Sequence, residues 1–186
     1  RETFARYLHA HSSRRDRPFI EVGVSAISRG NAAPELFGSE RDGDIHYGRL
    51  EQASGGTLFL DEIADMDLEA QAQLVGALDT GSFMRVGGSA SVDVDVRVIA
   101  ATQRDLQHAV EEGKFREDLF YQLNVVPLVV PPLRDHREDI PELLESAVDG
   151  LVEQDKLPYR RFSIGAQNVL RHHLWPGNIR ELKNLV

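Results

Sequence analysis

The stretch Gly55-Gly56-Thr57-Leu58-Phe59-Leu60-Asp61-Glu62 decides the fold of this chain. Its residues 57 to 60 are all apolar or β-forming, which is typical of a strand buried on both faces of a parallel sheet. Ligands of open α/β sheets bind at the carboxyl ends of the strands. We therefore expect Asp61 and Glu62 to lie where a ligand binds.

Two neighbouring carboxylates at such a position suit phosphoryl chemistry. One of them can hold Mg²⁺, directly or through water. The other can orient or deprotonate a water molecule for attack on a phosphoryl group. The ordinary alternative is a strand that ends in a polar turn. The four-residue apolar run followed by paired acids favours the functional interpretation.

Length, charge and composition bound the remaining possibilities. The chain has 186 residues, enough for one domain or a domain with a small appendage, and 41% hydrophobic content permits a substantial core. The net charge of -9 argues against a nucleic-acid-binding surface here, because phosphate contacts need clustered Lys and Arg. Cysteine is absent, which excludes disulfides and Cys nucleophiles. We find no signal peptide and no apolar run near the ~20 residues of a membrane span, so we expect no membrane contact and a cytoplasmic location.

Periodicity predicts a series of alternating strands and helices along the first two-thirds of the chain. In order, it predicts a helix over 2–11, a strand over 19–24, an irregular polar stretch over 38–48, a strand over 57–61, a helix capped by Asp67 and ended by Gly81, a strand over 92–101, a helix over 105–112 and a strand over 125–130. Pro127 cannot donate to a strand ladder, so the last strand should lie at an edge. The alternation predicts an α/β fold with a parallel sheet flanked by helices.

The pattern changes after Pro131-Pro132, where we expect only helices. These span 137–154, 163–173 with Ser163 as the N-cap, and 177–186. The natural division is an α/β part over 1–132 and a smaller helical part over 133–186. Both ends of the chain fall inside helical patterns, so we expect a fragment of a longer protein.

Six segments, taken in order, resemble the motifs of one family. They are 35–38 (Glu-Leu-Phe-Gly), 48–63 (Walker B), 85–88 and 94–102 (the approach to sensor I), 115–119 (arginine finger) and 175–182 (sensor II). The chain resembles the central ATPase domain of bacterial enhancer-binding proteins, the sigma-54-dependent transcriptional activators of the AAA+ class. The resemblance covers essentially all 186 residues. It implies a P-loop NTPase-type sheet over 1–132 that binds nucleotide, and a helical lid over 133–186.

The resemblance also implies roles for individual residues toward ATP or ADP and Mg²⁺. Asp61 holds Mg²⁺, and Glu62 polarises the attacking water. Thr102 senses the γ-phosphate at a strand end, and Arg180 reaches back from the lid to the phosphates. Arg116 acts on the nucleotide of a neighbouring subunit, where an arginine supplied in trans raises the rate by ~10³ or more. Such a site forms only between subunits, so the resemblance implies self-association into a ring or a dimer.

For the two arginines, the residues by themselves favour a simpler interpretation. Arg116 can form a surface ion pair with Glu117 or Asp118, and Arg180 can pair with Glu181 on its own helix. Only the surrounding motifs favour a role at the nucleotide.

The chain departs from the family pattern at five places. The Gly-rich Walker A loop is missing from this sequence. By its spacing to Ala5-Arg6, Arg1 aligns with the lysine of that loop, which makes Arg1 a phosphate contact and places the rest of the loop upstream or in a disordered segment. The loop that carries GAFTGA in the family, and that touches the sigma factor, is replaced by the shorter segment 39–47. The second arginine of the finger segment is Gln122. The Asn that restrains the catalytic Glu is Gly23, and the Asn beside the sensor threonine is Gln103. Nitrogen-regulation-type response regulators without GAFTGA are similar in this respect.

Several functions are compatible with these features. The first is a regulatory module that binds ATP or ADP, hydrolyses it weakly and does not contact the sigma factor of RNA polymerase through GAFTGA. The resemblance implies a receiver domain before it and a DNA-binding domain after it. The second is an active ATP-hydrolysing motor that remodels a promoter complex. The third is an oligomerisation domain without nucleotide. Another AAA+ enzyme, such as a chelatase, is disfavoured by the segment 175–184.

Overall fold

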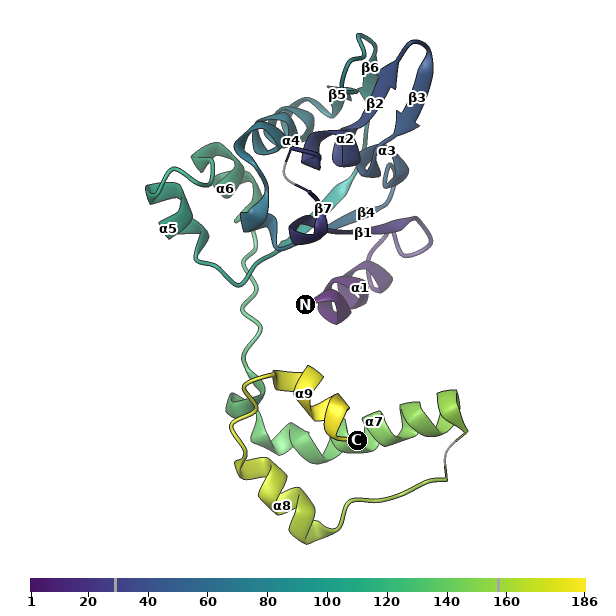
Figure 1. The fold of residues 1–186 in the computed structure, drawn as a ribbon, viewed down its shortest axis with the longest axis vertical. Coiled ribbons are helices and arrows are strands. Elements are labelled where there is room, and N and C mark those ends of the chain that lie inside the picture. Colours follow the sequence, from purple (N-terminus) through teal and green to yellow (C-terminus); the bar gives the residue numbers. More distant parts are fainter. Residues whose placement is uncertain (29, 157) are drawn as a thin grey trace. The chain divides into compact units, whose positions relative to one another are not determined.

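The chain folds into two compact units. The computed structural model describes residues 1–28, 30–156 and 158–186. The first unit is Arg1–Pro127 and the second is Leu128–Val186. Figure 1 shows the strands in the first unit and helices in the second. The sequence places the division between residues 132 and 133. The assignment of nucleotide binding to the first part and of a lid to the second stays a prediction, because the division into compact units does not show which residues bind a ligand.

The main sheet of the first unit has three parallel strands. They are β1 (Phe19–Gly23), β4 (Thr57–Asp61) and β7 (Arg97–Ala101), in the order β1-β4-β7. β4 is therefore central, and its residues 57 to 60 are all buried. The predicted buried strand and the predicted α/β class are confirmed.

Helices cover both faces of the sheet. Successive side chains of β4 point to opposite faces, and because they are apolar or β-forming, both faces are buried. Helix α1 (Glu2–Ala10) packs on one face, where the His9 Nδ1 lies 3.0 Å from the Thr57 Oγ1 and Phe19 stacks on Phe59. Leu58 and Leu60 point to the opposite face and join the main hydrophobic core. That core also holds residues of α2 (Ala32–Phe37), α3 (Arg49–Gln52) and α4 (Leu68–Thr80).

Helix α4 begins and ends where the sequence predicts. The Asp67 carboxylate accepts a hydrogen bond from the Ala70 amide at 2.8 Å, which satisfies one of the free donors of the first turn. Gly81 ends the helix in the left-handed conformation, with φ of 67°. The 3₁₀ turn η2 (Ile63–Asp65) connects β4 to this helix, so residues that follow the paired acids lead directly into α4.

The stretch 38–48, predicted to be irregular, contains a β-hairpin. Strands β2 (Gly38–Arg41) and β3 (Asp44–Tyr47) pair antiparallel. Asp42 and Gly43 form the two-residue turn, both with positive φ, as a hairpin turn of this length requires. The Asp-Gly pair was the signal for it.

The prediction of one strand over 92–101 is wrong, because the segment divides between two sheets. β6 (Ser91–Asp93) pairs antiparallel with β5 (Ser82–Met84), whereas β7 pairs with β4. Between them the backbone bonds elsewhere: the Val94 amide donates to Gly81, and the Asp95 carbonyl accepts from Gly55. These bonds redirect the chain from one sheet to the other.

The predicted strand over 125–130 is also wrong. In the described part of the chain this segment has no strand partner, and Val125 and Val129 are 75% and 90% exposed. A strand needs a neighbour for its backbone groups, and Pro127 cannot donate to one. Before it lie α5 (Leu106–Glu111) and α6 (Glu117–Leu123), of which α6 was not predicted.

The second unit consists of helices, as predicted. α7 (Ile140–Asp155), α8 (Ile164–His172) and α9 (Asn178–Leu185) follow the short turns η3 (Leu133–Asp135) and η4 (Arg137–Asp139). The Ser163 hydroxyl caps α8 by accepting from the Ala166 amide at 3.2 Å. The hydrophobic core of the second unit is formed by Leu133, Ile140, Leu144, Trp175 and Leu182.

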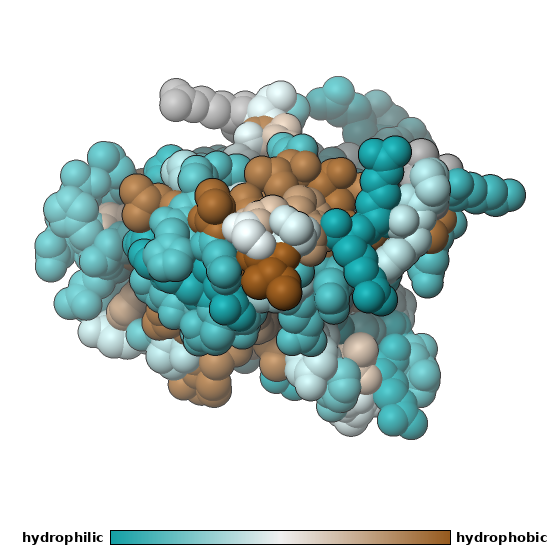
Figure 2. Space-filling view, turned by 90° about the horizontal axis from the view of Figure 1, so that it is seen from below, coloured by the Kyte–Doolittle hydropathy of each residue, from teal (hydrophilic) through white to brown (hydrophobic). Residues whose placement is uncertain are grey.

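Large apolar side chains are exposed on the surface of both units. In Figure 2 brown apolar groups appear between teal hydrophilic ones, and the second unit exposes large apolar residues such as Ile164 and Val169. None of the helices in the described ranges combines the length and the apolar character that crossing a membrane requires.

Candidate functional site

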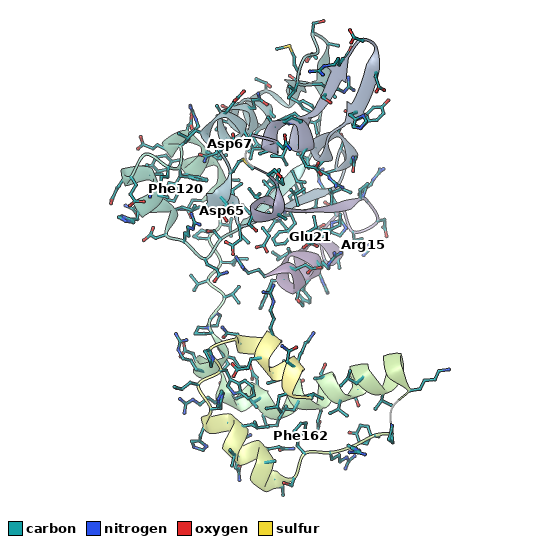
Figure 3. All side chains as sticks on the ribbon, viewed as in Figure 1. Arg15, Glu21, Asp65, Asp67, Phe120 and Phe162 are labelled. Atoms are coloured by element: carbon teal, nitrogen blue, oxygen red, sulfur yellow. The ribbon has the colours of Figure 1, made fainter. Side chains whose placement is uncertain are left out.

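The carboxyl ends of the three parallel strands place the paired acids at the centre of one sheet edge. Asp61 is the last residue of β4 and lies in register between Gly23 of β1 and Ala101 of β7. Glu62 and Thr102 are the next residues on their segments. In Figure 3, Asp65 marks the turn that continues from this edge toward Asp67 and α4. The sheet therefore brings Asp61, Glu62 and Thr102 to one edge, although they come from segments about 40 residues apart.

Glu62 adopts a backbone conformation that is unusual for its residue type. Its φ and ψ are 57° and 50°, in the left-handed region. A residue other than glycine held there costs about 1–3 kcal/mol, and such residues cluster at functional sites. This conformation turns the chain after β4, where the 3₁₀ turn η2 begins.

Arg1 forms ion pairs with both acids. Its Nη2 lies 2.8 Å from the Glu62 Oε1, and its Nη1 lies 3.3 Å from the Asp61 Oδ1. All three side chains are mostly buried. The pair with Arg1, together with hydrogen bonds from Gln103, lowers the pKa of the Glu62 carboxyl below its ordinary value. Glu62 is therefore an anion at neutral pH, and Arg1 supplies the positive charge beside it.

Gln103 holds the same carboxylate from the segment after β7. Its side-chain Nε2 donates to the Glu62 Oε1 at 2.8 Å, and its backbone amide donates to the Oε2 at 3.2 Å. The sequence showed Gln103 only as a departure from the family pattern. Its contact with Glu62 spans 41 residues, and no local periodicity reports such a pairing.

Among the described residues, Asp61 has an oxygen that is held only by the ion pair with Arg1. Its Oδ1 is buried and has no hydrogen-bond partner in the described part of the chain. A buried carboxylate oxygen needs a compensating charge or hydrogen bond, and here the compensation is the Arg1 guanidinium at 3.3 Å, so this atom is suited to a cation. Mg²⁺ typically takes one or two protein carboxylates and completes its shell with water and phosphate oxygens. The residues present therefore fit Mg²⁺, even though the described residues contain no cluster of three or more acidic, His or Cys side chains that could hold a metal unaided.

Thr102 lies at the same edge as the acids. Its Oγ1 accepts a hydrogen bond from the Arg104 amide at 3.0 Å, and a hydroxyl that accepts one bond can still donate its own hydrogen. The Arg104 guanidinium pairs with the Asp65 carboxylate at 2.6 Å. This ion pair ties the segment after β7 to the segment after β4, so Thr102 is held near the acids.

Arg116 lies away from the acids in sequence, at the N-cap of α6. Its Nε and Nη2 donate to the two carboxylate oxygens of Asp118 at 3.0 and 2.7 Å. The surface ion pair that the residues alone favoured is thus present. The side chain is about two-fifths exposed, so it is accessible to another molecule. Gln122, which stands where the family has a second arginine, donates to the Asp79 carboxylate on α4.

Arg180 lies in the first turn of α9, in the second unit, and is exposed. The pair with Glu181 does not appear among the described residues. The Glu181 Oε2 instead accepts from the Gly177 amide at 2.9 Å. Arg180 belongs to the second unit and the paired acids belong to the first, and the role of Arg180 toward nucleotide stays a prediction.

Comparison with known proteins agrees with this geometry. Residues 1–129 match the family model "Sigma-54 interaction domain", and residues 134–186 match "AAA+ ATPase lid domain". The chain is 47% identical over 191 residues to the DNA-binding transcriptional regulator NtrC of Rhizobium meliloti. It is 45% identical over 188 residues to the nitrogen assimilation regulatory protein NtrX of Azorhizobium caulinodans. In both comparisons all of this chain is covered, but only 39% and 41% of the relative. The chain therefore spans about two-fifths of the length of these regulators.

Solved structures show the same fold. Crystal structures of NtrX from Brucella abortus in complex with ADP and with ATP match with TM-scores of 0.93 and 0.92, at 45% identity. Each match covers 98% of this chain, and 41% or 40% of the other. Hsp104 matches with a TM-score of 0.69 at 16% identity, which shows the fold alone. Strand order, paired acids and both family models lead to one conclusion: this chain belongs to the sigma-54 interaction domain family of AAA+ proteins, the central domain of NtrC- and NtrX-type regulators.

Proposed function

We propose that this chain is the nucleotide-responsive module of a DNA-binding transcription regulator. It binds ATP or ADP with Mg²⁺ at the carboxyl edge of its main sheet, and the bound nucleotide controls self-association into a ring or dimer. The observation that carries the proposal is the pair Asp61–Glu62 at the end of the central strand, with a buried Asp61 oxygen that is held by the Arg1 guanidinium at 3.3 Å and by no hydrogen bond from the described residues. The NtrX neighbours in complex with ADP and ATP support it.

Each residue at the nucleotide has its own role in the proposed reaction. Asp61 holds Mg²⁺, which when bound neutralises phosphate charge. Glu62 is ionised and orients a water molecule toward the γ-phosphate. Thr102 donates its hydroxyl to a phosphate oxygen. Arg116 of one subunit reaches the nucleotide of the next after leaving Asp118.

Two further arginines complete the phosphate contacts in this proposal. Arg1 exchanges one of its carboxylate partners for phosphate, because a cation beside ionised acids readily serves an anion brought to the same place. Arg180 approaches from the lid side of the nucleotide. Both carry a charge that is permanent at neutral pH.

Hydrolysis at this site is weak in our proposal, for three structural reasons. Gln103 and Arg1 already occupy the oxygens of Glu62, so a water molecule must compete with them. Gly23 pairs with Asp61 in the sheet and has no side chain that could restrain the Glu62 carboxylate by a hydrogen bond. Gln122 carries no charge and donates to Asp79, so Arg116 acts without a second arginine.

The hairpin β2–β3 replaces the sigma-factor loop of the family. Its turn is formed by Asp42 and Gly43, and both β3 and the turn are exposed. A charged two-residue turn lacks the apolar and hydroxyl groups of the GAFTGA tip. We propose that this chain regulates transcription through nucleotide-dependent assembly and through DNA bound by another domain, without that direct contact to the sigma factor.

The first test is turnover by the full-length protein and by its Glu62→Gln variant. We expect the wild type to hydrolyse ATP at less than about 1 s⁻¹, at the low end of enzyme rates. Glu62→Gln should lower this rate by about 100-fold or more, since it removes the proposed base at the site, and leave the ATP dissociation constant within about threefold. Glu69→Gln, on the exposed first turn of α4, is the matched control and should change neither value.

The outcomes separate the alternatives. Fast turnover that is lost in Glu62→Gln means an active motor, and it overturns the proposal of weak hydrolysis. Turnover that is equal in both proteins removes Glu62 from the chemistry.

A further inference from the structure

Gln71, on α4, is a buried polar residue that the site described above does not use. It has no exposed surface. Its Nε2 donates to the Met66 carbonyl at 2.7 Å and to the Lys114 carbonyl at 3.2 Å, and its Oε1 accepts from the Arg116 amide at 2.8 Å. A buried amide is tolerated only when its donors and acceptor are satisfied, and here three bonds satisfy them. An apolar residue of the same shape would fill the space without this requirement.

These three hydrogen bonds connect two segments that carry residues of the proposed reaction. Met66 lies at the end of the turn that follows Glu62, directly before α4. The other two partners, Lys114 and Arg116, flank Phe115, whose side chain is buried in the main core. One side chain therefore connects the segment behind the paired acids to the segment that carries Arg116.

One of these hydrogen bonds holds the backbone amide of Arg116, which has no partner within its helix. Arg116 is the N-cap of α6, and the first amides of a helix have no partner within the helix. Gln71 supplies the partner for the Arg116 amide, while Asp118 holds the guanidinium through two bonds. The backbone is thus fixed from α4 and the side chain is directed from α6.

We propose that Gln71 is a positioning residue for Arg116. It sets the place of this arginine relative to the acids of its own subunit, so that a shift of the turn after Glu62 moves the arginine offered to the neighbouring subunit. The inference rests on the proposed role of Arg116 in trans. Precise placement matters because a displacement of about 1 Å of a reacting group can cost about 100-fold in rate.

The test replaces Gln71 by methionine in the full-length protein. Methionine keeps the length of the side chain and removes all three hydrogen bonds. We expect kcat for ATP to fall by about 10-fold or more, while KM changes less than threefold. The Arg116 amide, which Gln71 protects, should exchange with solvent at least tenfold faster. Gln73→Met is the matched control on the same helix, because the Gln73 Oε1 is buried without a hydrogen bond; it should change neither quantity.

A double-variant comparison shows whether Gln71 acts through Arg116. If it does, Gln71→Met lowers kcat in the wild-type background and causes no further loss when Arg116→Ala is present. Additive losses overturn the inference, as does an unchanged exchange rate at the Arg116 amide. If Arg116→Ala alone leaves turnover unchanged, the proposed function of Arg116 fails, and the exchange rate still decides whether Gln71 fixes that backbone.

One measurement does not depend on the variant folding. In the wild-type full-length protein the Arg116 amide should exchange at least 100-fold more slowly than in an unstructured peptide, because it donates to a buried oxygen. Exchange at the peptide rate would overturn the inference even if Gln71→Met does not fold.

Discussion

Replacement of Asp61 by asparagine is expected to lower the affinity of the full-length protein for ATP by about 10- to 100-fold when Mg²⁺ is present. Asparagine keeps the shape of the side chain and removes the negative charge that the buried Oδ1 offers to a cation, a charge that here faces the Arg1 guanidinium at 3.3 Å. In EDTA the affinity should change by less than threefold, since the metal no longer contributes. Isothermal titration calorimetry in the two buffers measures both values.

The comparison of the two buffers makes this prediction specific. A variant that merely distorts the sheet edge loses affinity with and without Mg²⁺. The control is Asp93→Asn on β6, which removes an exposed carboxylate from a strand of another sheet and should change neither affinity. Equal losses in Mg²⁺ and in EDTA would contradict the assignment of the metal to Asp61, as would no loss in either.

Gly56→Ala should destabilise the first unit by about 3 kcal/mol or more. A methyl group at Gly56 would lie 2.0 Å from the Pro18 carbonyl oxygen, which is a backbone atom and cannot turn away. The same residue accepts a hydrogen bond from the Arg97 amide at 3.0 Å, so it is held between β1 and β7. Gly56 is required because the backbones on either side of β4 approach closely, whereas Gly55 has a φ of 79°, a conformation that favours glycine.

Hydrogen exchange at the amides of β4 in the full-length protein measures this loss, because it reports the free energy of opening at that strand. Gly76→Ala is the control within the same unit. Gly76 is in the middle of α4 with no atom within 4 Å of the added methyl, so alanine should stabilise the helix by about 0.5–1 kcal/mol. Equal exchange in Gly56→Ala and the wild type would contradict the close approach.

The sequence predicted those elements whose signals are local. The apolar run of β4 lies in the middle of the sheet, and Asp67 and Gly81 cap α4 at both ends as expected. Ser163 likewise caps α8. Each of these features depends on residues within a few positions of one another, and the physical cause of each can be read from one segment.

The errors concern features that depend on a distant partner. The apolar segment 125–130 has the composition of a strand, but a strand also needs a neighbour, and none pairs with it among the described residues. The alternation over 92–101 is genuine, yet hydrogen bonds at Val94 and Asp95 divide it between two sheets. Composition indicates that a segment prefers to be extended, and does not indicate which strand it joins.

For the candidate site too, the sequence predicted the local features and missed a contact between distant segments. The position of Asp61 and Glu62 at a strand end follows from the motif, and the ion pair of Arg116 with Asp118 was anticipated from their spacing. The hold of Gln103 on Glu62 was not, because it joins segments that only the parallel register of β4 and β7 brings together. A residue that looked like a loss in the sequence turns out to contact the proposed catalytic carboxylate.

The most direct test of this account is a calorimetric titration of the full-length protein with ATP and with ADP in the presence of Mg²⁺. We predict binding of one nucleotide per chain, with an affinity that falls when EDTA replaces Mg²⁺. A protein that binds neither nucleotide would contradict the account and would identify the chain as an assembly domain that has kept the sheet and its two acids without their ligand.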